Sequence, residues 1–289
     1  MRDGLISLGR RLLARRGAAL GLAFLALVAL AAAFAGLLPL DPLGQSVADA
    51  LKPPSSESWF GTDELGRDIL ARVVYGARTS LVTAFGAVLT AALVGVPVGL
   101  VAGFYGGWRD SLLMRCIDVL LALPNILFAM ALIAVLGRSQ SAALIAVGVA
   151  GIPGFARIAR AQVMTLRSLD FVTAVRGFGG KPGYIMFRTI LPNALSPLVV
   201  QAIVLASIAI LLEAALAFLG VGVPPPTPSW GEMLRTGKSY LYEAPSYAVL
   251  PGLVLTLTIL SFDTIGRALT AILDRDETDA SGATIGGRR

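Results

Sequence analysis

The sequence predicts an all-α membrane protein whose chain crosses the bilayer six times. Of its 289 residues, 56% are hydrophobic and 15% are charged, and its mean hydropathy is +0.77. Ordinary soluble domains carry about 25% charged residues, so this chain has too few charges to cover a soluble surface, and it is too apolar to be intrinsically disordered. The chain has no histidine and one cysteine. These counts exclude a histidine general base, a Ser-His-Asp triad, an HExxH zinc site and an internal disulfide.

Stretches without Asp, Glu, Lys or Arg locate the helices. They cover residues 17–40, 79–108, 119–137, 139–156, 189–212 and 244–262. A helix needs about 20 mostly apolar residues to cross a bilayer, so we expect spans near 18–38, 80–104, 112–136, 141–160, 194–220 and 247–270. Membrane β-strands would be shorter and alternating. Pro97, Pro124 and Pro153 are expected to kink the spans that contain them. The predicted span at 141–160 is the most interrupted, because it contains Gly151, Pro153 and Gly154.

The distribution of cations predicts the orientation of the spans. With the amino terminus inside, 17 of the 24 Lys and Arg residues fall on the inner side and 7 on the outer side. Both termini are therefore expected in the cytoplasm, and the basic excess reflects topology rather than a nucleic-acid site. Residues 33–35, Ala-Phe-Ala, resemble a signal-peptide cleavage site. The apolar run before them is longer than the 7–15 residues of a signal peptide, so an uncleaved first helix is expected.

Glycines at regular spacing in the second span predict close helix packing. Gly95, Gly99 and Gly103 recur every four residues, and small residues at this spacing let two helices approach closely.

Charged residues inside the spans are candidate functional groups. Glu213 lies deep in the fifth span without an opposite charge nearby in sequence. We expect it either to hydrogen-bond to a facing helix or to line a pathway. Asp118 follows Arg115 by three residues and is expected to pair locally or to reach the membrane surface rather than to contact a substrate. Asp263 and Arg267, four residues apart, are expected to pair.

The first outer connection, residues 41–78, contains a candidate helix start. Thr62 or Asp63 can cap a helix, with Glu64 complementing its dipole. An apolar face follows, which predicts an interfacial helix leading into the second span. The alternative is a docking or gating element at the outer mouth, with Asp63, Arg67 and Asp68 as its candidate residues.

The other outer connection, residues 220–247, begins with a proline-rich run that predicts a stiff, extended loop ending at Trp230, a further docking or gate candidate. Thr236-Gly237-Lys238-Ser239 looks like the end of a P-loop. Five residues separate Gly231 from Gly237, however, where a P-loop has four, and the predicted side of the membrane lacks ATP. We therefore expect no nucleotide site and no enzymatic activity in this chain.

The long inner connection, residues 161–193, is predicted to be a helix, a turn and a second helix. Glycines at 177, 179 and 180 break the pattern in its middle. Both halves carry apolar side chains that so short a hairpin cannot bury on itself. Either lipid headgroups cover them or a groove on a cytoplasmic partner does.

Four blocks of residues carry a family resemblance. Thr173-Ala174-Val175, followed by Gly179 and by Leu191-Pro192, resembles the EAA loop of ABC importer permeases, with Thr173 at the Glu position and Val175 at the second Ala. The other blocks are similar to the second permease subunit of dipeptide, oligopeptide and nickel importers. They are Phe60-Gly61-Thr62-Asp63 with Gly66-Arg67-Asp68, Leu211-Leu212-Glu213-Ala214-Ala215 with Phe218-Leu219-Gly220, and residues 225–231 (Pro-Pro-Thr-Pro-Ser-Trp-Gly).

The resemblance implies the transmembrane domain of a type I ABC importer in a bacterial inner membrane. Residues 1–78 would hold the amino terminus, first helix and outer segment, residues 79–271 the permease core with a coupling loop at 161–193, and residues 272–289 a cytoplasmic tail. The coupling residues would be those of the EAA-like pattern: Thr173, Ala174, Val175, Gly179, Leu191 and Pro192. Glu213 is the candidate for the translocation pathway.

The resemblance also implies partners. A sister permease would complete a heterodimeric pore, two ATPase subunits would bind ATP and magnesium, and an extracytoplasmic binding protein would deliver di- or oligopeptides. No cofactor, metal or catalytic residue is expected in this chain. The same architecture could carry nickel chelates, glutathione or another small solute. A secondary transporter is disfavoured, because the sequence shows no inverted repeat.

Overall fold

The protein is a bundle of long helices. The computed structural model describes residues 9–286, with side chains up to residue 273. Arg2, Arg288 and Arg289 of the predicted inner side lie outside the described residues. The main helices are α2 (Arg16–Ala33), α3 (Ile69–Tyr105), α4 (Gly107–Leu121), α5 (Asn125–Leu136), α6 (Gln140–Leu166), α10 (Leu195–Phe218) and α12 (Ser246–Gly286). Shorter helices are α7 (Asp170–Gly177), α8 (Pro182–Tyr184), α9 (Leu191–Asn193) and α11 (Trp230–Gly237).

The short helical turns lie in the connections. The 3₁₀ turns are η1 (Ala35–Leu37), η2 (Val47–Asp49) and η4 (Lys238–Tyr240), and a π-helical segment, η3 (Ile185–Ile190), joins α8 to α9. An isolated antiparallel bridge pairs Thr62 with Asp68. Regular structure in the described residues is otherwise helical, which confirms the predicted all-α class.

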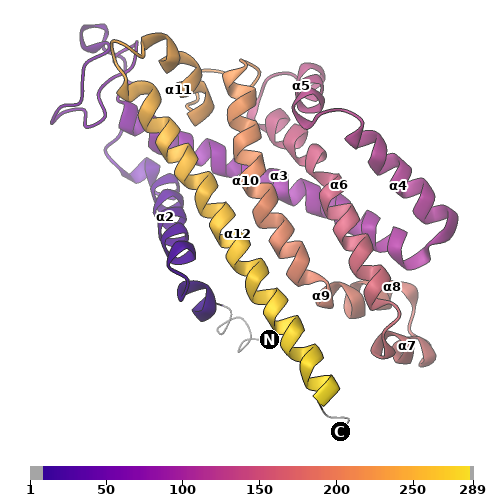
Figure 1. The fold of residues 1–289 in the computed structure, drawn as a ribbon. Helices are drawn as coiled ribbons and strands as arrows, with labels where there is room; N and C mark the ends of the chain where they lie inside the picture. The colour runs from indigo at the N-terminus through magenta and orange to yellow at the C-terminus, as the bar shows by residue number, and fades with distance from the viewer. Residues whose placement is uncertain (1–8, 287–289) are drawn as a thin grey trace.

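The two ends of the bundle differ in what they carry. In Figure 1, α7 lies at one end, together with the first residues of α2 and the last part of α12, and α11 lies at the opposite end. We refer to these as the α7 end and the α11 end. Helix α12 continues to Gly286, so the described part of the segment expected as a tail, residues 272–286, extends the last span as a helix.

Five helices of the described residues are long and apolar enough to cross a membrane, and a sixth span results if the bent pair α4–α5 is counted as one. The predicted third span is therefore broken. Helices α4 and α5 meet at 88° across residues 122–124, because Pro124 has no N–H to donate and lies at the start of α5. The kink expected at Pro124 is thus a break.

The predicted fourth span is continuous, contrary to the interruption suggested by its composition. Helix α6 runs through Gly151, Pro153 and Gly154 without a break. A Cβ on Gly151 would lie 2.6 Å from a Leu205 methyl group of α10 and 3.1 Å from the Ala91 methyl group of α3. Neighbouring helices pack closely on this segment, and such packing maintains helices that contain Gly and Pro in membranes.

The glycines of α3 bring it against α6, as expected from their spacing. A Cβ on Gly95 would lie 2.7 Å from the carbonyl oxygen of Ile152, and one on Gly103 would lie 2.8 Å from that of Arg160. A Cβ on Gly99, which lies between these two glycines, would come even closer to the Ala156 carbonyl oxygen. The two backbones therefore touch at four-residue intervals, and α3 and α6 form the most extensive contact between helices of the described chain.

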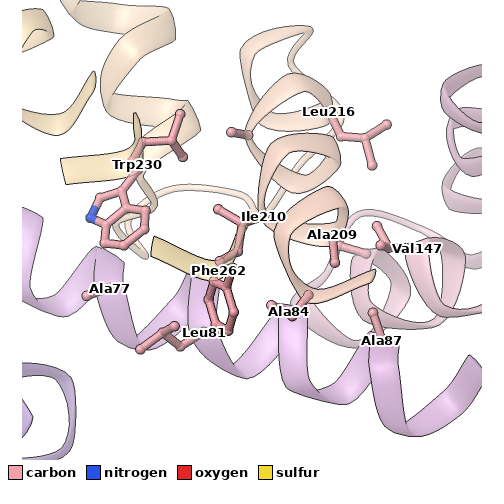
Figure 2. Packing of buried hydrophobic residues seen from close by; sticks show 14 of the residues in the cluster. Ala77, Leu81, Ala84, Ala87, Val147, Ala209, Ile210, Leu216, Trp230 and Phe262 are labelled. Carbon is pink, nitrogen blue, oxygen red and sulfur yellow. The ribbon is translucent and has the colours of Figure 1, made fainter. Parts of the chain in front are cut away.

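The main hydrophobic core lies between α3, α6, α10 and α12. Figure 2 shows small residues on α3, Ala77, Ala84 and Ala87, in one cluster with larger residues of other elements such as Trp230, Ile210 and Phe262. Alternation of small and large side chains lets the helices interdigitate without voids.

The outer segment differs from its prediction. Neither Thr62 nor Asp63 caps a helix. The cap is Asp68, whose carboxylate accepts a hydrogen bond from the Leu70 N–H, and helix α3 begins directly at Ile69. The apolar face assigned to an interfacial helix is thus the first part of the second span itself, because nothing interrupts the helical sequence after Asp68.

Candidate functional site

The connection between α6 and α10 forms the predicted hairpin. Helix α7 carries Asp170 in its first turn and Arg176 in its last turn, each favourable with the helix dipole. The helix ends at Gly177, and Gly179, just beyond the capping residue Phe178, has φ of +80°. The N–H of Gly180 bonds to the Val175 carbonyl, and the N–H of Gly179 bonds to that of Arg176. These bonds form a Schellman motif, which favours glycine at the left-handed position.

One side of the hairpin is anchored to the bundle. Val172 of α7 is fully buried in a cluster with Leu100 of α3, Val163 of α6 and two residues of η3, Ile185 and Ile190. Val175 and Leu191, which belong to the predicted coupling residues, pack against the same cluster. The Arg176 guanidinium also lies 5.8 Å from the centre of the Phe104 ring of α3. The hairpin is therefore attached to α3 and α6.

The other side of the hairpin is uncovered. Phe178 is 93% exposed, and Tyr184 and Phe187 are each about half exposed. The remaining predicted coupling residues, Thr173, Ala174, Gly179 and Pro192, are also exposed. The structure thus divides the six predicted residues into two that anchor the hairpin and four on its surface.

At the α11 end, Asp63 lies at the centre of a buried ion cluster. Its Oδ2 accepts a hydrogen bond from Arg67 Nε at 2.6 Å and lies 3.3 Å from Arg72 Nε, and its Oδ1 accepts backbone N–H bonds from Leu65 and Arg67. Arg72 reaches on to Glu232 of α11 at 3.1 Å. Asp63, Arg67 and Arg72 are all buried. The cluster therefore joins the outer loop, α3 and α11.

Of the predicted docking or gate residues, three are buried within this chain. Asp63 and Arg67 belong to the ion cluster. Trp230 is fully buried, and its indole N–H donates to the Val73 carbonyl at 3.0 Å. Gly76 makes room for the ring, since a Cβ there would lie 3.2 Å from Trp230 Cδ1. Asp68 caps α3, and burial raises the pKa of its carboxyl group above the usual value.

Glu213, the predicted pathway residue, is buried between helices. Its carboxylate accepts a hydrogen bond from the Ser80 hydroxyl of α3 at 3.0 Å. Its second oxygen, Oε1, has no hydrogen-bond partner among the described residues. The expected bond to a facing helix is therefore present, and the side chain does not reach the surface of this chain.

A pocket of about 600 Å³ opens beside the ion cluster at the α11 end. Its charged lining includes Glu64, Arg67, Glu232, Arg235 and Lys238. Nothing in the sequence groups these residues, because they come from the outer loop and from α11 and the turn after it.

Some charged residues of the predicted spans pair within one helix, and others pair between two helices. Asp263 and Arg267 pair at 2.8 Å as expected. Asp118 instead pairs with Arg157 of α6 at 2.7 Å, so the prediction that it pairs locally with Arg115 is wrong. No sequence pattern pointed to this partner, because it lies 39 residues away. Arg160 of α6 and Asp110 of α4, which sequence reasoning also missed, form a bidentate pair with two bonds of 2.6 Å.

The described residues contain no group of three or more His, Cys, Asp or Glu side chains that could hold a metal ion.

Comparisons with known proteins identify related sequences. Residues 95–278 match the family model described as binding-protein-dependent transport system inner membrane component. Residues 7–54 match the N-terminal transmembrane domain of oligopeptide transport permease C.

Three curated relatives align over most of both chains. The dipeptide transport system permease protein DppC of Alkalihalophilus pseudofirmus is 43% identical over 89% of this chain and 85% of its own. The di/tripeptide transport system permease protein DppC of Pseudomonas aeruginosa is 41% identical, over 90% and 88%. The glutathione transport system permease protein GsiD of Pectobacterium atrosepticum is 39% identical, over 89% and 85%.

The fold resembles a solved transporter. A chain of the inward-facing MetNI methionine ABC transporter aligns with a TM-score of 0.54 at 20% identity, covering 70% of this chain and 97% of its own. At this identity the likeness concerns the fold alone, and it agrees with the type I importer fold expected from the sequence.

Proposed function

Because the chain belongs to the family of binding-protein-dependent transport system inner membrane components, we propose that it is the transmembrane permease subunit of an ABC importer for di- and oligopeptides. The peptide cargo is supported by the relatives named as dipeptide and di/tripeptide permeases, which align over about nine-tenths of this chain. In this role the chain forms half of the translocation pathway in a bacterial membrane.

The observation that carries this proposal is the two-sided hairpin at the α7 end. One side packs on α3 and α6, and the other exposes Phe178, Tyr184 and Phe187. Exposed aromatic side chains on a short helical hairpin suit a groove on a partner protein. An ATPase subunit that binds ATP and magnesium would supply this groove, since the chain has no P-loop of its own.

The anchoring explains how the hairpin would transmit force. The hairpin connects α6 to α10 and is packed on α3 through Val172 and Leu100. The Arg167 guanidinium at the end of α6 also donates to the Gly103 carbonyl of α3 at 2.9 Å. A displacement of α7 by a closing ATPase would therefore move the adjoining ends of all three helices as one body.

The remaining partners follow from this arrangement. The α7 end would face the cytoplasm together with both termini, as the excess of cations on that side predicts. A sister permease would complete the pore. The α11 end would face the binding protein. The ion cluster of Asp63, Arg67 and Arg72 is buried, and so is the ring of Trp230. These side chains would therefore maintain the shape of the docking surface rather than contact the binding protein directly.

The proposal is tested on the assembled complex. The chain is co-purified with a sister permease and two ATPase subunits, reconstituted in liposomes, and supplied with a binding protein and a labelled dipeptide. We expect ATP-dependent uptake that requires this chain. Phe178→Ser is expected to weaken ATPase association with little change in the permease itself, because the ring is almost wholly exposed. Absence of dipeptide uptake by an active, assembled complex would overturn the peptide assignment.

Glutathione is a second candidate cargo, favoured by the 39% identical glutathione permease. It is itself a tripeptide, so the same pathway could accept it. The two cargoes are distinguished by measuring, in the same liposomes, whether excess glutathione reduces the uptake of labelled dipeptide and whether labelled glutathione is taken up. Uptake of labelled dipeptide that is unaffected by excess glutathione favours the general peptide importer, and uptake of glutathione alone favours the alternative.

A further inference from the structure

An ion pair lies on the exposed surface of the helical bundle. Arg157 of α6 and Asp118 of α4 are joined at 2.7 Å, and their side chains are 56% and 59% exposed. Both residues belong to helices that are long and apolar enough to cross a membrane, α4 as part of the bent pair with α5. An ion pair exposed to hydrocarbon would be unfavourable, because lipid offers no hydrogen bonds to the remaining polar atoms.

The pair lies well inside the span. At 1.5 Å per residue, Arg157 is about 14 Å from the end of α6 at Leu166, and Asp118 is about 16 Å from the start of α4 at Gly107. Helix α6 is about 40 Å long and exceeds the hydrocarbon core by about 10 Å in total. Arg has a long side chain that can reach towards the membrane surface, but the single methylene of Asp118 cannot.

The same part of α4 ends in a break whose backbone is exposed. Residues 121–125 are all exposed, and they include the turn of 88° between α4 and α5. The last carbonyl groups of one helix and the first N–H groups of the next lack helical partners. Irregular backbone at membrane depth occurs where protein covers it or where it lines a water-filled cavity, but not against lipid.

A polar stripe extends along α4 to this break. Ser111, Arg115 and Asp118 are exposed and are spaced by four and three residues, so they share one face of the helix. The exposed stripe of α3 is different in composition. After Arg78 near its start, it consists of Val82, Phe85, Leu89 and Leu93, as expected for a surface in contact with apolar groups.

We propose that the polar face of α4, with Arg157 of α6, lines the aqueous translocation pathway and that Asp118 and Arg157 bind the charged termini of the passing peptide. A free peptide carries an ammonium group and a carboxylate group. Asp118 can accept the former and Arg157 the latter, so the ion pair exchanges partners without changing the net charge of the site. The proposal rests on the proposed function, because it needs a peptide and a sister subunit across the pathway.

The surface is tested by labelling in the assembled complex. The natural cysteine is first removed by Cys116→Ala, so that it cannot react. A single new cysteine is then introduced into this variant, either Ala122→Cys or the control Leu89→Cys. The two positions lie at similar depth, since each is 15 or 16 residues from the α7 end of its helix. A charged, membrane-impermeant thiol reagent is expected to label Ala122→Cys, more slowly in the presence of binding protein, dipeptide and ATP, and not to label Leu89→Cys. An unlabelled Ala122→Cys, as expected if the sister permease or lipid covers this face, would overturn the proposal.

The role of the charges is tested by counting peptides imported per ATP hydrolysed in liposomes. Loss of one charge-assisted hydrogen bond corresponds to roughly tenfold weaker binding, so Asp118→Asn and Arg157→Gln are each expected to lower this ratio about tenfold. The matched control is Asp110→Asn, which breaks the less exposed pair of the same two helices and is expected to lower thermal stability without lowering the ratio. An unchanged ratio in both Asp118→Asn and Arg157→Gln would overturn the assignment. Failure of the proposed function itself is distinguishable, because the wild-type complex would then import no peptide.

Discussion

Arg72 of α3 and Glu232 of α11 form a buried ion pair of 3.1 Å between residues that are 160 positions apart in the sequence. Arg72 also lies 3.3 Å from Asp63, so one guanidinium group faces carboxylates from two different segments. This single side chain ties the outer loop and α11 to the start of the second span.

Replacing Arg72 is expected to destabilise the α11 end. Arg72→Met leaves Asp63 and Glu232 buried without this cation, and removing one partner of a buried pair costs about 3–5 kcal/mol. We expect a lower thermal midpoint of the purified complex. Arg78→Met serves as the control, because Arg78 is exposed on the same helix. Equal midpoints for the two variants would contradict the role of the cluster.

Gly99 is expected to set the distance between α3 and α6. A Cβ at this position would lie 2.7 Å from the Ala159 methyl group and closer still to the Ala156 carbonyl oxygen. Gly99→Leu should therefore separate the helices and reduce assembly of the complex, measured by size-exclusion chromatography. Gly17→Ala, at a position where a Cβ would meet no atom within 4 Å, should have no such effect. A well-assembled Gly99→Leu complex would show that the packing adapts.

Gly179 is expected to act through backbone conformation alone. Its φ is +80°, and a Cβ at this position would have no atom within 4 Å, so a larger side chain meets backbone strain but no clash. The strain is about 1–2 kcal/mol for most residues, and Asn tolerates this region better. Gly179→Leu should leave the complex assembled but abolish substrate-stimulated ATP hydrolysis, whereas Gly179→Asn should retain most of it. Normal stimulation in the Leu variant would contradict the coupling role of the hairpin.

Asp68 is expected to make stability depend on pH. Burial raises the pKa of its carboxyl group in the folded protein, so ionisation costs more in the folded than in the unfolded chain. Its contribution to stability is therefore most favourable below the unfolded value of about 3.9 and is lost as pH rises through the folded value. Asp68→Asn keeps the cap and does not titrate.

The thermal midpoint of Asp68→Asn relative to wild type should accordingly rise between acidic and neutral pH. Asp68→Ala is the control for the cap, since its loss costs about 1 kcal/mol whether or not the carboxyl group is ionised. A difference between wild type and the Asn variant that is constant over this range would contradict the raised pKa.

Much of the fold was predictable because a bilayer acts on local composition. Each span needs a run of apolar residues, so the helices could be found from charge-free stretches. The spacing of Gly95, Gly99 and Gly103 predicted close packing for the same local reason. The break at Pro124 and the continuity through Pro153 were harder to foresee, since a proline is tolerated or not according to the helices packed around it.

The candidate site was predictable in part. The EAA-like pattern located the hairpin, and its glycine matched the turn. Which side of the hairpin is anchored could not be read from the pattern, because Val172 is buried by Leu100 and Val163 of other helices. Trp230 and Asp63 were expected at a docking surface, but both are buried.

The membrane class, the approximate spans and the lack of a P-loop motif follow from composition and from short motifs, so the amino-acid sequence is enough to establish them. Which charges meet depends on the packing of the helices. Asp118 bonds to Arg157 rather than to the nearby Arg115, and Arg72 reaches Glu232, because helix packing brings together side chains from separate elements. The low charged fraction shows that few charges are present, and the packing shows which of them are buried and which lie at the surface.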